Sequence, residues 1–112
     1  RVLSEVAVGY LLAGRRQAAT VQDFGVEGLY LAVDTSSTVP SEGDVLRIDF
    51  PVVTPSEVLM VRMFVAVRWS YGAQEPGTSG RGVGVKIIDF ENPAERGVYE
   101  DYVTYLLADA GS

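Results

Sequence analysis

Apolar and polar side chains alternate with a period of two through most of the first ninety residues, a pattern typical of half-buried β-strands. Stretches rich in Gly, Pro, Ser and Asp interrupt the alternation and indicate turns or loops. The strands predicted in this way are 1–12, 17–24, 29–33, 44–50, 58–69 and 82–90. We expect the first two to form a hairpin.

The predicted strand 58–69 is the longest, and its alternation is the clearest. One face carries Leu59, Val61, Met63, Val65, Val67 and Trp69. The opposite face carries Arg62 and Arg68, and a slip of one residue would bury both arginines. The register should therefore be firmly set, and the same alternation predicts that Trp69 packs in the core.

A helical period replaces the strand period after residue 90. Asn92 suits an N-cap, Pro93 the first helical position and Glu95 the third, which together form a capping-box arrangement. Apolar residues then recur at helical spacing: Val98, Tyr99, Tyr102, Val103, Leu106 and Leu107. This apolar stripe needs a surface to lie on. The sequence therefore predicts an all-β fold with one C-terminal helix, in which six or seven antiparallel strands close into a small barrel or sandwich.

The chain has 112 residues, a length typical of one domain, and we expect 1–112 to be a single domain. Because it opens on Arg1 rather than Met, we expect it to be a piece of a longer or trimmed protein. Fifteen acidic and nine basic residues give a net charge of −6, which disfavours duplex nucleic acid as a partner. The apolar runs are too short for a membrane span.

The sequence contains no cysteine and no histidine. Thiol nucleophiles, cysteine zinc sites and Ser-His-Asp arrangements are therefore excluded, and the commonest metal ligand is missing. No carboxylates, lysines or tyrosines are placed to cooperate in catalysis. We expect a protein that is not an enzyme, with no catalytic residue, no metal site and no cofactor.

The order "QDFGVEGLYL", "VPSEGDVLRIDFP", "VAVRW" and "GRGVGVKIIDF", followed by a capped helix, resembles the PilZ domain. That family implies a six-stranded bacterial barrel that serves as a receptor for cyclic di-GMP in the cytoplasm. Its ligand signature consists of Arg-x-x-x-Arg before the first strand and Asp/Asn-x-Ser-x-x-Gly between the second and third strands. The resemblance implies that Arg1 is the second arginine, and that Asp23, Gly25 and Gly28 form the turn.

The match has two gaps, and both fall on the ligand signature. Gly25 stands where the family has serine, which removes a hydroxyl, and the first arginine would lie upstream of Arg1. A receptor of this ligand needs guanidinium groups for phosphate or guanine edges, and a carboxylate for the guanine N1 and N2 edge. Arg1 and Asp23 could supply one of each.

Each candidate residue also has a simpler interpretation. Asp23 and its glycines could merely turn the chain, and Arg1 could be a solvated terminus. Trp69 could pack in the core or stack on a guanine, and Lys86 could be an exposed strand lysine or a ligand contact. Two functions are therefore compatible with the sequence. The first is a degenerate PilZ-type regulatory domain that binds nucleotide weakly or not at all and acts through a protein partner or an adjacent domain. The second is a working cyclic di-GMP receptor. The glycine at position 25 favours the first.

Overall fold

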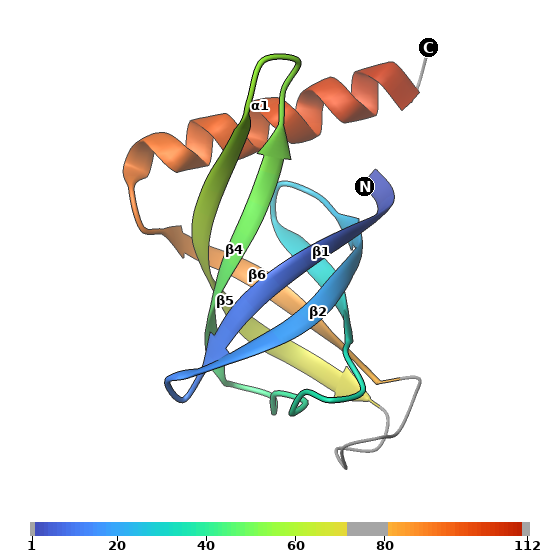
Figure 1. Cartoon of the computed structure of the whole chain (residues 1–112), viewed down its shortest axis with the longest axis vertical. Coiled ribbons are helices and arrows are strands. Elements are labelled where there is room, and N and C mark those ends of the chain that lie inside the picture. Colours follow the sequence, from blue (N-terminus) through green and yellow to red (C-terminus); the bar gives the residue numbers. More distant parts are fainter. Residues whose placement is uncertain (1, 72–80, 111–112) are drawn as a thin grey trace.

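A computed structural model describes residues 2–71 and 81–110, which form a closed antiparallel barrel and one helix (Figure 1). The elements are β1 (Val2–Leu12), β2 (Arg15–Phe24), β3 (Gly28–Val33), β4 (Val45–Val53), β5 (Val58–Tyr71), β6 (Gly82–Phe90) and α1 (Pro93–Ala110). The strands are ordered β1-β2-β3-β6-β5-β4 around the barrel. The predicted fold class is confirmed, with six strands. Most of the predicted loop 70–81 lies outside the described residues.

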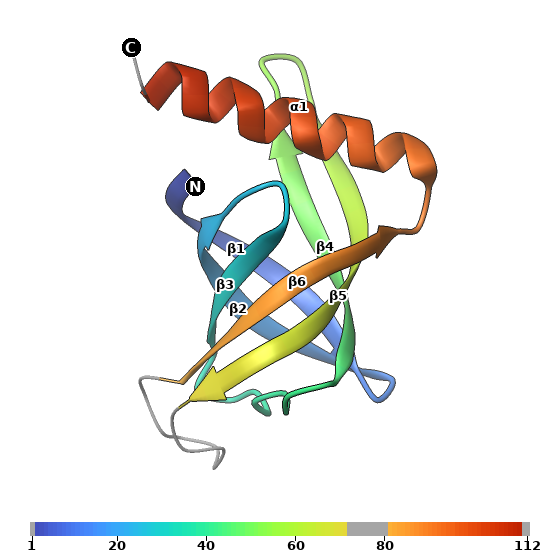
Figure 2. The ribbon, with the colours of Figure 1, turned by 180° about the vertical axis from the view of Figure 1, so that it is seen from behind.

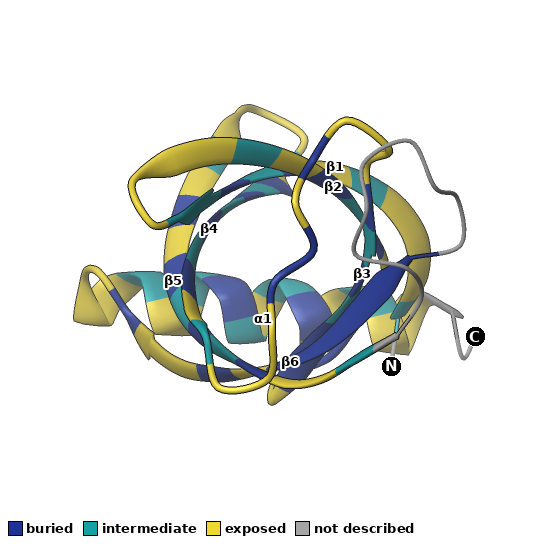
Figure 3. Ribbon diagram, turned by 90° about the horizontal axis from the view of Figure 1, so that it is seen from below, coloured by how far each residue is buried: buried dark blue, intermediate teal, exposed yellow. Residues whose placement is uncertain are grey.

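The interior of the barrel is filled by the apolar side chains that the alternation placed inward, including Leu46, Ile48 and Phe50. Figure 3 looks along the barrel and shows the connection between β3 and β4 crossing one opening. At this end the Tyr10 hydroxyl donates a hydrogen bond of 2.8 Å to the Thr38 carbonyl. Burial raises the pKa of Tyr10 to about 12. This opening is therefore closed by the chain itself.

Helix α1 begins with the predicted cap. The Asn92 side chain accepts a hydrogen bond of 3.0 Å from the Ala94 amide, and the Glu95 carboxylate accepts one of 3.0 Å from the Asn92 amide. Two of the amides left without helical partners at the N-terminus are thereby satisfied. Arg62 of β5 lies 2.9 Å from Glu91 and 3.5 Å from Glu95, so ion pairs also hold this end of the helix against the barrel.

The helix lies across the other end of the barrel (Figure 2). Its most deeply buried residues are Tyr99 and Val103, both 0% exposed, one helical turn apart. The Tyr99 ring lies 5.4 Å from that of Phe50 and 5.9 Å from that of Phe90. The predicted stripe is therefore centred on Tyr99 and Val103. Val98, Tyr102 and Leu106 are half-buried beside it, and Leu107 is exposed.

The seam between β1 and β4 has the shortest pairing in the barrel. Gly9, Tyr10 and Leu11 pair with Asp49, Ile48 and Arg47, and no other described residues of these strands pair with each other. By contrast, all nine residues of β4 pair with β5. Beyond Asp49 the two strands diverge, and the end of the β4–β5 hairpin stands beside α1 (Figure 1).

Candidate functional site

Two β-bulges aim side chains at one place on the outer surface of the barrel. In β2 the register with β3 shifts between Val21 and Asp23, and in β5 the register with β6 shifts between Val67 and Trp69. Both valines point into the core. Strict alternation would send Asp23 and Trp69 inward as well, whereas the extra residue in each strand turns them outward.

Trp69 therefore does not pack in the core, and that prediction is wrong. Its side chain is 45% exposed, although the five preceding residues of the same parity are buried or half-buried. The alternation holds as far as Val67, and the bulge at Arg68 reverses it. Both Arg68 and Trp69 lie outside the barrel as a result.

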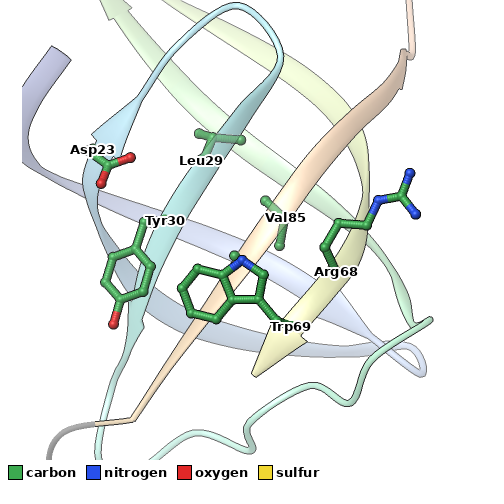
Figure 4. A pocket seen from close by; sticks show the side chains of 7 residues that line it. Asp23, Leu29, Tyr30, Arg68, Trp69 and Val85 are labelled. Atoms are coloured by element: carbon green, nitrogen blue, oxygen red, sulfur yellow. The ribbon is translucent and has the colours of Figure 1, made fainter. Parts of the chain in front are cut away.

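These residues line an open hollow of about 360 Å³ (Figure 4). Its lining consists of Asp23, Leu29, Tyr30, Arg68, Trp69, Gly84 and Val85. Trp69 lies between Tyr30 and Arg68, and the Tyr30 and Trp69 rings stack with centroids 5.6 Å apart. The hollow thus combines a carboxylate from β2 with an aromatic pair from β3 and β5. Arg68 of β5 lies at its border, and its guanidinium group points away from Asp23 (Figure 4).

Glycines of β6 make room for the two rings. A Cβ atom built on Gly84 would lie within about 2.3 Å of the Trp69 indole, and one built on Gly82 would overlap the Tyr30 hydroxyl. Both glycines are on the outward face of β6. Gly84 pairs with Tyr30 on one side and with Trp69 on the other, and Gly82 lies two residues away on the same face. The "GVGV" segment therefore serves as a flat floor on which the aromatic side chains lie.

The corner between β2 and β3 is held from within. The Gly25 amide donates a hydrogen bond of 2.9 Å to the Gly28 carbonyl, and the Gly25 carbonyl accepts one of 2.6 Å from the Tyr99 hydroxyl. A Cβ atom on Gly28 would lie 2.5 Å from the Val85 carbonyl oxygen, so close packing of β3 against β6 requires glycine there. Gly25 and Gly28 thus form the corner and do not line the hollow.

The structure brings two of the predicted site residues together, Asp23 and Trp69. Lys86 is exposed and pairs with Gly28 and Ala66, and it is not part of the lining. Arg1 lies outside the described residues. Whether any of these residues contacts a ligand stays a prediction.

Sequence reasoning missed Tyr30 and Arg68 as members of this group. Tyr30 looked like any outward residue of a short strand, and Arg68 like a solvated strand arginine. The signal that could have found Tyr30 is the pair Gly82 and Gly84, because glycines on one face of a strand indicate that something bulky lies against it.

The chemistry of this hollow suits a planar, hydrogen-bonding ligand. A carboxylate such as Asp23 accepts hydrogen bonds from adjacent N–H groups, and an exposed indole stacks on a base. A guanidinium such as Arg68 contacts phosphate or base acceptors. Among the described residues, no group of acidic side chains is clustered in a way that could hold a metal ion.

Fold and surface together define the class: a closed six-stranded antiparallel barrel with a helix across one end and a hollow on its outer face. The solved structure of the inhibitor of motility (MotI/DgrA) from Bacillus subtilis is similar, with a TM-score of 0.76 and 8% sequence identity. The match covers 96% of this chain and 49% of that one, so the chain spans about half the length of that protein. No family model and no curated protein matches the sequence.

At 8% sequence identity, this similarity establishes a shared fold and nothing further. The PilZ-like architecture expected from the sequence, a six-stranded barrel with a C-terminal helix, is confirmed at that level. Within residues 2–71 and 81–110, no helix combines the length and the apolar character needed to cross a bilayer.

Proposed function

We propose that this chain is a non-enzymatic regulatory domain of cyclic di-GMP signalling, whose nucleotide site is the hollow between Asp23 and Trp69. In this proposal the nucleotide binds weakly, and the domain acts through contacts with an adjacent domain or a partner protein. The proposal takes 1–112 as one domain of a longer bacterial protein in the cytoplasm, in keeping with the PilZ-like fold.

The pair of bulges is the observation that carries the nucleotide part of this proposal. Each bulge interrupts a regular ladder, and together they turn an acid and an indole toward one hollow. Bulges commonly re-aim side chains beside functional sites. An acid and an aromatic ring are the groups that read and stack a guanine, since the N1 and N2 hydrogens need an acceptor and the base needs a flat surface.

The absence of a side chain at Gly25 is the reason to expect weak binding. A serine there would offer a hydroxyl as an additional hydrogen-bond partner for the ligand, whereas both backbone groups of Gly25 already bond within the protein. A titration of residues 1–112 alone also lacks any contact from an arginine ahead of Arg1, and each such charge-assisted contact is worth ~1–3 kcal/mol. A strong receptor is the second candidate, and the same two bulges favour it.

Trp69 provides a direct test because it is the chain's only tryptophan. Cyclic di-GMP should change its fluorescence, with half-saturation above tens of micromolar and no saturable heat in calorimetry below that range. Restoring the family pattern, with Gly25→Ser and an Arg-x-x-x extension ahead of Arg1, should tighten binding by about 10-fold or more, since ~1.4 kcal/mol corresponds to one factor of ten.

Two controls make the titration specific. Cyclic di-AMP should bind more weakly than cyclic di-GMP, because adenine lacks the N1–H and N2 amino group that Asp23 would accept from. Asp23→Ala should abolish the fluorescence response, whereas Glu42→Ala, which removes an exposed acid in the β3–β4 loop outside the hollow, should leave it unchanged. Low-micromolar binding that needs Asp23 would favour the strong receptor. If neither the native nor the restored chain gave a binding signal at millimolar nucleotide, the nucleotide site would be refuted. Only the protein-contact part of the proposed function would then remain.

A further inference from the structure

A second hollow, more apolar than the first, lies between the end of the β4–β5 hairpin and the middle of α1. Its volume is about 370 Å³. The hairpin contributes Val52, Val53, Thr54 and Pro55, and the helix contributes Val98, Asp101, Tyr102 and Tyr105. We call this surface the hairpin–helix groove. Its lining comes from β4, the β4–β5 turn and α1, and it shares no residue with the hollow at Asp23 and Trp69.

The hairpin wall of the groove is held in a fixed shape. The Thr54 amide and hydroxyl both donate to the Glu57 carbonyl at 2.9 Å, and the Glu57 amide donates to the Thr54 hydroxyl at 3.0 Å. Three hydrogen bonds therefore close the turn between β4 and β5. A preformed wall of this kind reduces the ordering cost of binding.

Apolar side chains around the groove remain exposed. Val53 is 57% exposed and Tyr105 is 66% exposed, and the outer face of the hairpin adds Val58 and Met60. Single exposed apolar residues are common, but a contiguous group beside a concave surface is typical of a protein contact. The barrel itself does not cover these side chains.

The charged residues nearest the groove are mainly negative. Segments 50–61 and 97–110 contain Glu57, Glu100, Asp101 and Asp109 and no basic residue. The flanking arginines are engaged by acids: Arg96 lies 3.9 Å from Glu100, and Arg62 pairs with Glu91 and Glu95. Asp101 lies in the groove lining itself. An occupant therefore has to combine apolar side chains with positive charge.

The charge also argues against other occupants. Anionic membrane surfaces and nucleic acids would meet mainly like charge here. A second copy of this chain carries the same net charge of −6 and would bring the same acidic segments together. A basic polypeptide segment satisfies both the apolar surface and the charge.

We propose that the hairpin–helix groove docks a polypeptide segment whose apolar side chains are flanked by lysine or arginine. The apolar side chains fill the space between Val53 and Tyr105, and the basic residues lie near Asp101 and Glu57. The inference builds on the protein contacts of the proposed function and names their surface. It does not depend on nucleotide binding.

Selection from a displayed random-peptide library tests the chemistry of the partner without knowing its name. The immobilised 112-residue chain serves as bait, and the Val53→Asp variant removes peptides that bind elsewhere. Enriched peptides should carry a net positive charge together with large apolar residues. The best of them, made synthetically, should bind the native chain with an affinity that falls several-fold when the salt concentration is raised.

Matched variants separate the groove from the rest of the surface. Val53→Asp should weaken the synthetic peptide by 10-fold or more, whereas Val45→Asp should not. Val45 is equally exposed at 57% and lies roughly 26 Å away at the other end of β4. Asp101→Lys should weaken binding several-fold, and Glu42→Lys, which changes the net charge equally in the β3–β4 loop, should have little effect.

Several outcomes would overturn the proposal. They are failure to enrich any peptide, enrichment of acidic or uncharged peptides, and equal losses in the Val53→Asp and Val45→Asp variants. Sedimentation that reveals a dimer broken by Val53→Asp would assign the groove to a second copy instead. Because none of these measurements uses cyclic di-GMP, failure here and failure of the nucleotide site are distinguishable.

Discussion

Removing the hydroxyl of Tyr99 should destabilise the domain measurably while leaving its packing intact. The side chain is 0% exposed, and its hydroxyl donates to the Gly25 carbonyl at 2.6 Å. Tyr99→Phe keeps the ring against Phe50 and Phe90 but leaves the carbonyl without this donor. The loss of a buried hydrogen bond of this kind costs about 1–3 kcal/mol. For a domain of this size, each kcal/mol lowers the melting temperature by roughly 4 °C.

Thermal unfolding followed by circular dichroism, with urea denaturation as a second measure, gives the size of the effect. Tyr105→Phe is the matched control, because that ring is 66% exposed on the same helix, and its change should stay within about 0.5 kcal/mol. Tyr99→Ala should cost about 3–5 kcal/mol, since the ring contacts are lost as well. If Tyr99→Phe melted at the same temperature as Tyr105→Phe, the helix would not hold the β2–β3 corner through this bond.

Two further predictions concern the closed end of the barrel and the floor of the hollow. Because the folded pKa of Tyr10 is about 12 and the ordinary value about 10, folding stability should be unaffected below pH 10 and fall by about 2–3 kcal/mol as the pH rises to 12. Urea midpoints at pH 9 and 11.5 should show a smaller loss in Tyr10→Phe, and an equal loss would contradict the assignment. Gly84→Ala should displace the indole of Trp69 and change its emission. Gly97→Ala, whose Cβ meets no atom within 4 Å, should stabilise the helix by about 0.5–1 kcal/mol and leave the emission unchanged.

Local patterns in the sequence predicted most of the architecture. The first hairpin turns at Ala13 and Gly14, whose φ angles of 51° and 77° fit a two-residue turn matched to the twist of the strands. The cap at Asn92 and the inward faces of β4 and β5 were also predictable. Each of these features depends on neighbours in the chain, so composition and spacing are sufficient to find them.

The candidate site could be predicted only in part, because it depends on strand pairing. Asp23 was found through its family motif, but its neighbour Trp69 comes from β5 and reaches it only when the barrel closes through β3 and β6. A bulge adds one residue without any change in composition, so the alternation gave no warning that Trp69 faces outward. Which side chains share the hollow is therefore determined by the register of strand pairing. The alternation of apolar and polar residues does not reveal that register once a bulge has interrupted a strand.

The short seam between β1 and β4 is the place where opening the barrel should require the least free energy. Strands joined over three residues should separate more readily than those joined over nine, so we expect local opening of the native state to begin here. An opened seam presents a row of unpaired backbone groups, which is a template for strand exchange with another molecule. Pro51 lies on β4 just beyond the seam and has no amide hydrogen to donate. The strand that is easiest to expose is thus also a poor template for aggregation.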